Sequence, residues 1–179
     1  SVVFKAYKQD GMPLILRVTE PSHRTSQAMK AELDYVNFLK SEGMGVCASL
    51  VCPLDGEKVR TYTDNQSGNE YHVYVTEFAE GAPIDFEKDW NVGLAKQLGT
   101  MVAKFKKANI KFNQNASKRH SYFDSEHVKN ALKYIPKDHK EAVEEWKLAH
   151  AWVSALDRTA EDFGVCHTDM HAGNFFITD

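Results

Sequence analysis

Two oxygen-bearing side chains near the end of the chain, Asp169 and Asn174, have the types and the spacing that phosphoryl transfer needs. They stand five residues apart around Gly173, which predicts a tight loop with both side chains turned into one pocket. In such a reaction a carboxylate accepts or orients the proton of the attacking hydroxyl, and an amide oxygen helps to hold Mg²⁺. Metal and positioning supply most of the catalysis, because the transferred group carries much negative charge. The pair therefore predicts a phosphoryl-transfer loop.

The same segment supports a second chemical hypothesis. His167, Asp169 and His171 alternate along the chain, so on an extended strand their side chains would share one face. Three such ligands could hold Zn²⁺ or Fe²⁺, as in a metal-dependent hydrolase. The loop-forming Gly173 and the features of the N-terminal half favour phosphoryl transfer instead.

The first half of the chain predicts strands with one helix among them. Residues 1–20 predict a hairpin, because apolar and polar residues alternate on both sides of the turn signal Asp10-Gly11. Residues 25–41 predict a helix, because apolar residues recur every three or four positions and Thr25 or Ser26 can cap its start. Further strands are expected at residues 46–53, 57–63 and 70–78.

The second half of the chain, after Gly81 and Pro83, has a helical pattern. The apolar residues between Leu94 and Phe105 form a stripe that predicts a helix of about four turns. We interpret that stripe as the core of a helical lobe. Further helices are expected at residues 125–135 and 138–160, a loop at 111–122 and a short strand at 175–177.

Residues 167–174 fit, at every fixed position, the His-x-Asp-x-His-x-x-Asn motif of the aminoglycoside phosphotransferase/choline kinase superfamily. The chain therefore resembles that superfamily, whose members are small-molecule kinases. The resemblance implies that Asp169 is the catalytic base and that Asn174 is a Mg²⁺ ligand. It also implies that His167 and His171 shape and brace the loop.

The N-terminal half supplies the charges that a kinase needs at the ATP phosphates. Arg17 stands in the middle of a predicted strand, and Glu32 stands on the following predicted helix. A kinase uses a cation at the α- and β-phosphates and an acid that holds the cation in place. The superfamily places a Lys or Arg and a Glu in this order and at this spacing. Arginine is always charged and binds phosphate through two nitrogens, so it can take the place of lysine.

The strand that ends near Phe78, with the segment Ala79–Pro83 after it, resembles the interlobe hinge of the superfamily. In that hinge backbone groups bond adenine while apolar side chains enclose it. By this resemblance Thr76 lies behind the adenine, and the backbones of Glu77 and Ala79 make the bonds.

The implied fold is α+β and protein-kinase-like, with a small antiparallel β-sheet lobe carrying one helix and a larger, mainly helical lobe. We expect the β-rich ATP-binding lobe at residues 1–78, the hinge at 79–83 and the helical lobe with the catalytic loop at 84–179. The chain is expected to be truncated at both ends, because the Gly-rich loop over the phosphates and the second metal-binding aspartate are missing. Asp179 is not assigned to metal, and little activity is expected of these residues alone.

Net charge and composition limit the kinds of partner that this protein is expected to bind. The net charge of -3, without a basic stripe, argues against a nucleic acid polymer. No apolar run approaches the roughly 20 residues that span a bilayer, so no membrane partner is expected. Reduced thiols in the cytoplasm are the simplest interpretation of three cysteines, Cys47, Cys52 and Cys166.

Together these features predict a cytoplasmic kinase that uses ATP and Mg²⁺ to phosphorylate a hydroxyl of a small molecule. The acceptors that the resemblance suggests are an aminoglycoside, choline or ethanolamine, homoserine, or a sugar. Two alternatives stay open: the metal-dependent hydrolase, and an inactive pseudokinase-like module that binds nucleotide without turnover.

Overall fold

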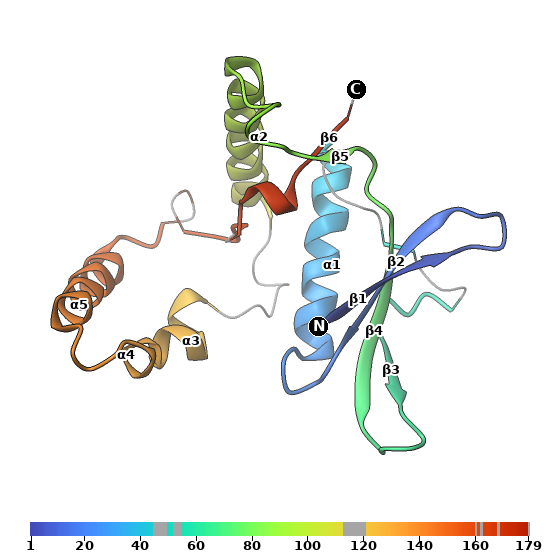
Figure 1. The fold of residues 1–179 in the computed structure, drawn as a ribbon, viewed down its shortest axis with the longest axis horizontal. Helices are drawn as coiled ribbons and strands as arrows, with labels where there is room; N and C mark the ends of the chain where they lie inside the picture. Colours follow the sequence, from blue (N-terminus) through green and yellow to red (C-terminus); the bar gives the residue numbers. More distant parts are fainter. Residues whose placement is uncertain are drawn as a thin grey trace. The chain divides into compact units, whose positions relative to one another are not determined.

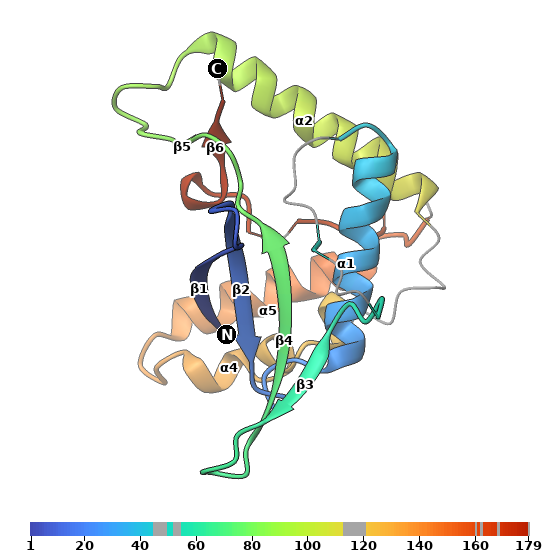
Figure 2. The ribbon, with the colours of Figure 1, turned by 90° about the vertical axis from the view of Figure 1, so that its right-hand side faces the viewer.

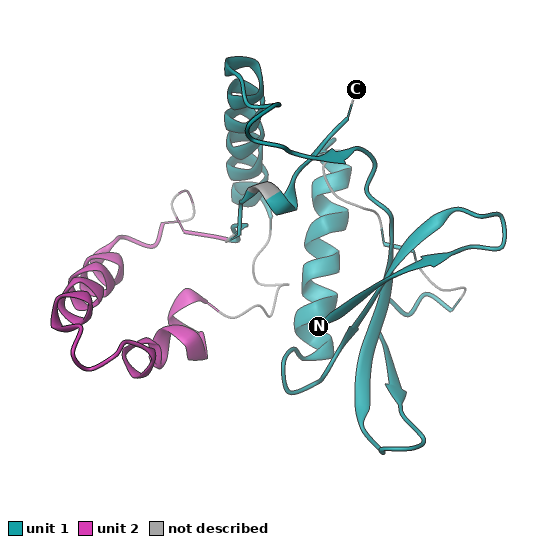
Figure 3. Ribbon diagram, in the orientation of Figure 1, with its two compact units in different colours: residues 1–118, 165–179 teal, residues 119–164 magenta. Residues whose placement is uncertain are grey.

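The computed structural model describes residues 1–44, 50–51, 55–112, 121–159, 161, 163–167 and 169–178, apart from the side chains of Asp124 and Ala172. The chain divides into two compact units (Figure 3). Unit 1 holds residues 1–118 and 165–179, and unit 2 holds residues 119–164. The expectations for Cys47, Cys52 and Asp179, and most of the strand expected at 46–53, lie outside the described residues.

Unit 1 contains a four-stranded antiparallel sheet with the order β1-β2-β4-β3 (Figure 1). Its strands are Val2–Tyr7 (β1), Pro13–Thr19 (β2), Arg60–Thr63 (β3) and Glu70–Glu77 (β4). The hairpin of β1 and β2 is confirmed, and Gly11 at its turn has a φ of 84°. A glycine suits that position because it has no Cβ to oppose a positive φ.

The register of the sheet determines which side chains share a face. Arg17 on β2 stands opposite Tyr74 on β4, and Ile15 stands opposite Thr76. Directly opposed residues point to the same side of a sheet, as do residues two apart on one strand. Arg17, Tyr74 and Thr76 therefore lie on one face.

Helix α1, Ser26–Ser41, covers that face (Figure 2). The Thr25 side chain accepts a hydrogen bond from the Ala28 amide at its start, so the predicted cap is confirmed. Met29 and Leu33 of α1 are buried with Tyr74 in one apolar cluster. Burial of large side chains of this kind contributes about 1.5–3 kcal/mol for each of them, which fixes α1 against the sheet.

Helix α2, Val92–Lys111, is capped by Asn91, whose side chain accepts a hydrogen bond from the Leu94 amide. Four residues of the predicted core stripe are half-buried: Leu94, Leu98, Met101 and Phe105. Ala108 is the buried residue of the helix, whereas Val102 is 44% exposed. The reason is that α1 and the chain near Val165 pack against the last turns of α2.

The described residues of unit 2 form the short helix η2 and three α-helices. Their bounds are Tyr122–Asp124 (η2), Glu126–Lys129 (α3), Ala131–Tyr134 (α4) and Lys140–Ala155 (α5). The helical segment expected at 125–135 is divided at Asn130, whose side-chain amide donates to the Glu126 carbonyl and so competes with continued helix. In α5 the rings of Trp146 and His150 stack with centroids 4.8 Å apart. None of the described helices has both the length and the apolar character of a bilayer-crossing segment.

A second, two-stranded sheet joins distant parts of unit 1. Strands Ala82–Pro83 (β5) and Phe176–Ile177 (β6) pair antiparallel, with Ala82 opposite Ile177 (Figures 1 and 2). The strand at the chain end was expected, but its pairing with β5 was not. Gly81 precedes β5 with a φ of 100°, and a Cβ built on it would lie 2.4 Å from the Ile177 carbonyl oxygen. The backbone of β6 therefore approaches as close as a glycine permits.

Replacing Gly81 by alanine is expected to lower the free energy of unfolding by about 2–3 kcal/mol, through the strained φ and the clash with Ile177. The matched control is Gly68→Ala, at a φ of 73° with nothing within 4 Å of the added Cβ. That substitution should cost only about 1–2 kcal/mol, the penalty of the left-handed conformation. Urea unfolding measures both variants, and equal losses would show that the approach of β6 is not tight.

Candidate active site

The loop between Cys166 and β6 brings Asp169 and Asn174 into direct contact. The side-chain amide of Asn174 donates to the Asp169 carbonyl oxygen at 2.7 Å and to the Asp169 carboxylate Oδ2 at 3.1 Å. The short helix η3, Ala172–Asn174, turns the chain back. The backbone N–H of Asn174 donates to the His171 carbonyl oxygen at 2.9 Å. The predicted convergence of the two side chains is therefore present, with the Asp169 carboxyl 72% exposed.

The two histidines hold the loop through their Nδ1 atoms. His167 Nδ1 accepts from the Asp169 amide at 3.3 Å, and His171 Nδ1 accepts from the Gly173 amide at 3.1 Å. A neutral imidazole with an accepting Nδ1 carries its proton on Nε2. His171 Nε2 lies 3.5 Å from Asp169 Oδ1, so this tautomer turns an N–H toward the carboxylate.

Gly173 fits tightly under the His171 ring. A Cβ at position 173 would lie 2.9 Å from His171 Cε1, closer than ordinary contact. The glycine thus permits the ring orientation that faces Asp169.

The backbone of this loop does not suit the three-ligand metal site. The His171 amide bonds the Asp169 carbonyl at 3.2 Å, so the chain turns here instead of running extended. Among the described residues no three His, Cys, Asp or Glu side chains form a group that could hold a metal ion. The geometry therefore does not favour a hydrolase based on His167, Asp169 and His171.

The loop does offer oxygen ligands to a cation such as Mg²⁺. Asn174 uses its nitrogen end for Asp169, which leaves Oδ1 facing away from that contact. An amide oxygen beside an exposed carboxylate is the donor chemistry that Mg²⁺ prefers, because this cation keeps several waters and takes few protein ligands.

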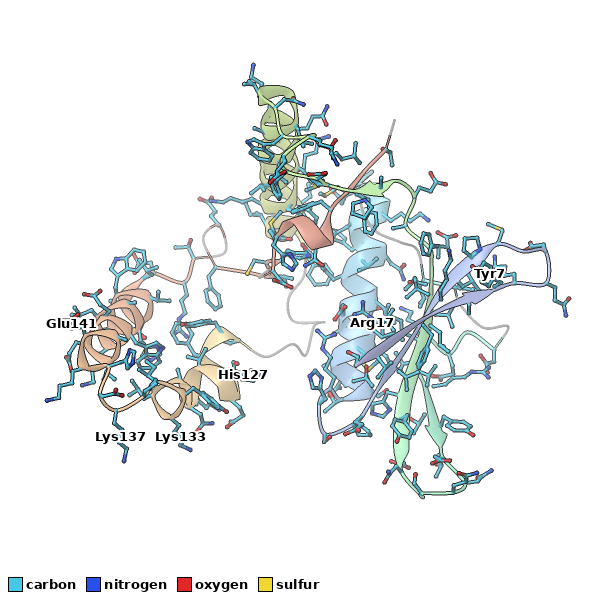
Figure 4. All side chains as sticks on the ribbon, in the orientation of Figure 1. Tyr7, Arg17, His127, Lys133, Lys137 and Glu141 are labelled. Carbon is cyan, nitrogen blue, oxygen red and sulfur yellow. The ribbon has the colours of Figure 1, made fainter. Side chains whose placement is uncertain are left out.

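A second group of charged side chains lies between the sheet and α1. One of them is Arg17 on β2, which is labelled in Figure 4. Its guanidinium lies over the ring of Tyr74, the residue opposite it on β4, 5.8 Å from the ring centroid. Glu32 on α1 forms an ion pair with Arg24, with 2.6 Å between Oε2 and Nη1. Burial raises the pKa of the Tyr74 hydroxyl, and the charges of Arg17, Glu32 and Arg24 also act on it. The four side chains are therefore neighbours.

Arg17 and Glu32, which the sequence predicts to act together, have different contacts in the structure. Arg17 is half-buried against Tyr74, whose pKa is raised by burial, so the tyrosine stays neutral at physiological pH. Glu32 has Arg24 as an ion-pair partner, a pairing that the sequence pattern did not predict. Arg24 precedes the helix cap, so it has no helical spacing to Glu32 that could have indicated the pair. That Glu32 braces Arg17 stays a prediction.

The expected hinge residues lie where β4 ends. Thr76 is half-buried, is opposite Ile15, and also forms a bridge with Leu50. Glu77 ends β4, and Ala79 follows three residues before β5. The pairing of β5 with β6 therefore ties the end of the expected hinge segment to the chain after Asn174. The proposed adenine contacts of these residues stay a prediction.

Three comparisons with known proteins show which family and which folds this chain resembles. The model of the phosphotransferase enzyme family matches residues 1–179. An amicoumacin kinase of Bacillus subtilis (strain 168) is 28% identical over 169 residues, which are 93% of this chain and 49% of that protein. The solved structure of amicoumacin kinase hAmiN in complex with AMP-PNP, Ca²⁺ and Ami has a TM-score of 0.86 at 25% identity, covering 98% of this chain and 52% of that one.

A microcompartment-associated aminopropanol kinase has the same fold, with a TM-score of 0.71 at 17% identity over 98% of this chain and 59% of its own. The expected protein-kinase-like α+β fold is thereby confirmed. The chain spans about half the length of the relatives it matches.

Proposed function

Because the chain belongs to the phosphotransferase enzyme family, we propose that it transfers the γ-phosphoryl group of ATP to a hydroxyl of a small molecule. The observation that carries this proposal is the contact between Asp169 and Asn174 in a loop tied to the hinge strand β5. Such an arrangement can place a base and a metal ligand at the phosphate end of a nucleotide.

In the proposed reaction Asp169 accepts the proton of the acceptor hydroxyl. At the same time the oxygen of that hydroxyl forms a bond to the γ-phosphorus of ATP. The bond from that phosphorus to the β,γ-bridging oxygen breaks, and ADP leaves. The N–H of His171 and the amide of Asn174 orient the carboxylate. Mg²⁺, held in part by Asn174 Oδ1, would neutralise charge on the phosphates.

The nucleotide is proposed to lie on the face of the sheet that carries Arg17 and Thr76. Arg17 would contact the α- and β-phosphates, with Glu32 as its brace. The backbones of Glu77 and Ala79 would bond the adenine. Because the reaction consumes ATP, we place it in the cytoplasm.

The acceptor is proposed to be a small molecule with a free hydroxyl, and amicoumacin is the first compound to test because two relatives are amicoumacin kinases. An aminoglycoside, choline, ethanolamine, homoserine and a sugar complete the panel. ADP release and isothermal titration with Mg²⁺-ATP test the proposal. Tight ATP binding with acceptor-dependent ADP release supports it. ATP binding without release by any acceptor indicates a pseudokinase-like module, and stoichiometric Zn or Fe retained without ATP binding would refute it.

Replacing Arg17 by alanine is expected to weaken ATP binding roughly 10- to 100-fold, the usual effect of losing hydrogen bonds to a charged group. The matched control is Arg60→Ala on β3 of the same sheet, an exposed arginine paired with Asp55, which should leave the ATP dissociation constant unchanged. Titration calorimetry measures both variants. An unaltered dissociation constant for Arg17→Ala would make Arg17 a surface charge.

A further inference from the structure

One asparagine connects the helix of Glu32 to the chain that enters the catalytic loop. The hydroxyl of Tyr35 on α1 donates to Asn109 Oδ1 on α2, and Asn109 Nδ2 donates to the Val165 carbonyl. We call these two hydrogen bonds the Asn109 bridge. Tyr35 and Asn109 are 74 positions apart in the sequence, and Asn109 and Val165 are 56 positions apart. All three residues belong to unit 1.

The Asn109 bridge lies in a largely apolar setting. Tyr35 is 8% exposed and belongs to the buried cluster that includes Leu39 and Ala108, with Val165 packed against it. The Phe112 ring meets the Tyr35 ring edge to face, with centroids 5.1 Å apart. Hydrogen bonds shielded from water are stronger, and a partner left unsatisfied there is costly. The bridge therefore holds its three elements in one arrangement.

The position of the bridge relates it to both halves of the proposed site. Tyr35 follows Glu32 by three residues, so the two side chains are neighbours along α1. Val165 precedes His167 by two residues, and His167 bonds the Asp169 amide. The bridge therefore connects the helix of Glu32 to the start of the loop.

We propose that Asn109 is a positioning residue, which holds the catalytic loop at a defined position relative to α1. Its side chain does this by accepting a hydrogen bond from Tyr35 and donating one to Val165. The proposal rests on the proposed function for its catalytic consequence. A side-chain amide suits this role because it offers a donor and an acceptor on one planar group. An aspartate of equal size would keep the acceptor for Tyr35 and lose the donor for Val165.

The test uses two variants of the full chain that each break one hydrogen bond. Asn109→Asp removes the bond to Val165, and Tyr35→Phe removes the hydroxyl while it keeps the ring against Phe112. We expect amide hydrogen exchange over residues 166–171 to rise about three- to tenfold in either variant, as one lost hydrogen bond allows. The double variant should add less than the sum of the two.

The exposed thiol of Cys166, next to Val165, gives a second readout. The rate at which a thiol reagent labels Cys166 should rise in the variants whose loop amides exchange faster. Peptide mass spectrometry measures this rate separately from the labelling of Cys47 and Cys52. The control is Lys111→Met, which breaks the 2.5 Å ion pair between Lys111 and Glu42 at the ends of the same two helices. Loop exchange in this control should stay at the parent value.

Parent-like exchange and labelling in both bridge variants would overturn the proposal, as would an equal rise in Lys111→Met. Under the proposed function, Asn109→Asp should also lower kcat with little change in the KM for ATP. These exchange experiments need no turnover. Loosening of the loop in a protein that does not bind ATP would therefore support the positioning role and refute the proposed function separately.

Discussion

Replacing Asp169 by asparagine is expected to lower kcat by about 10²–10⁴-fold, the usual contribution of a positioned general base. The change keeps the size of the side chain and removes the atom that would accept the hydroxyl proton. The dissociation constant of ATP should hardly change, because a base acts on the transition state and not on bound nucleotide. Single-turnover phosphoryl transfer and calorimetric ATP binding together measure the two effects.

Asp169→Ala serves as the companion variant. It also removes the carboxylate acceptor of the Asn174 side-chain amide and keeps the backbone carbonyl acceptor, so it tests whether the loop needs the side-chain contact for its shape. A kcat of the parent size in Asp169→Asn would remove Asp169 from its role. An equal loss of kcat and of ATP affinity would indicate a collapsed site instead of a missing base.

Replacing Asn174 by alanine is expected to lower kcat by about 10²-fold, a loss of the size seen when one oriented polar contact at a reacting centre is removed. Two causes combine, because Asn174 is proposed to give Oδ1 to Mg²⁺ and its nitrogen to the Asp169 carboxylate. The Mg²⁺ concentration for half-maximal activity should rise. A Mg²⁺ titration of initial rates measures the variant.

Asn174→Asp separates the two causes. It keeps an oxygen for Mg²⁺ but places a second carboxylate where a nitrogen now lies 3.1 Å from Asp169 Oδ2. Two close carboxylates raise the pKa of one of them, so the base would be protonated over more of the acidic range. Activity should therefore recover as pH rises in Asn174→Asp and stay low in Asn174→Ala. Identical pH profiles would contradict this division of roles.

Several structural features followed from local sequence. The hairpin around Gly11, the capped helix α1 and the Asp169–Asn174 loop were all predicted, and the structure shows each of them. Their bonds join residues a few positions apart, so residue type and spacing almost determine them. The superfamily resemblance, which rested mainly on a motif of eight residues, is confirmed by the family match over residues 1–179.

Other predictions stay open or needed correction. The lobe boundary at 79–83, the adenine contacts of the hinge and the roles assigned to individual site residues remain predictions. The α2 stripe is less covered than expected, because burial depends on which elements meet the helix and periodicity alone does not reveal this.

Residue types and their local spacing account for the chemical groups of the loop, its tight turn and the strand β6 after it. Tertiary structure alone decided that β5 pairs with β6, that Arg24 pairs with Glu32, and that Asn109 joins Tyr35 to Val165. The physical reason is distance along the chain. A local turn is favoured by its own residues, whereas a contact between distant segments forms only when the packing of whole elements offsets the entropy of closing a long loop.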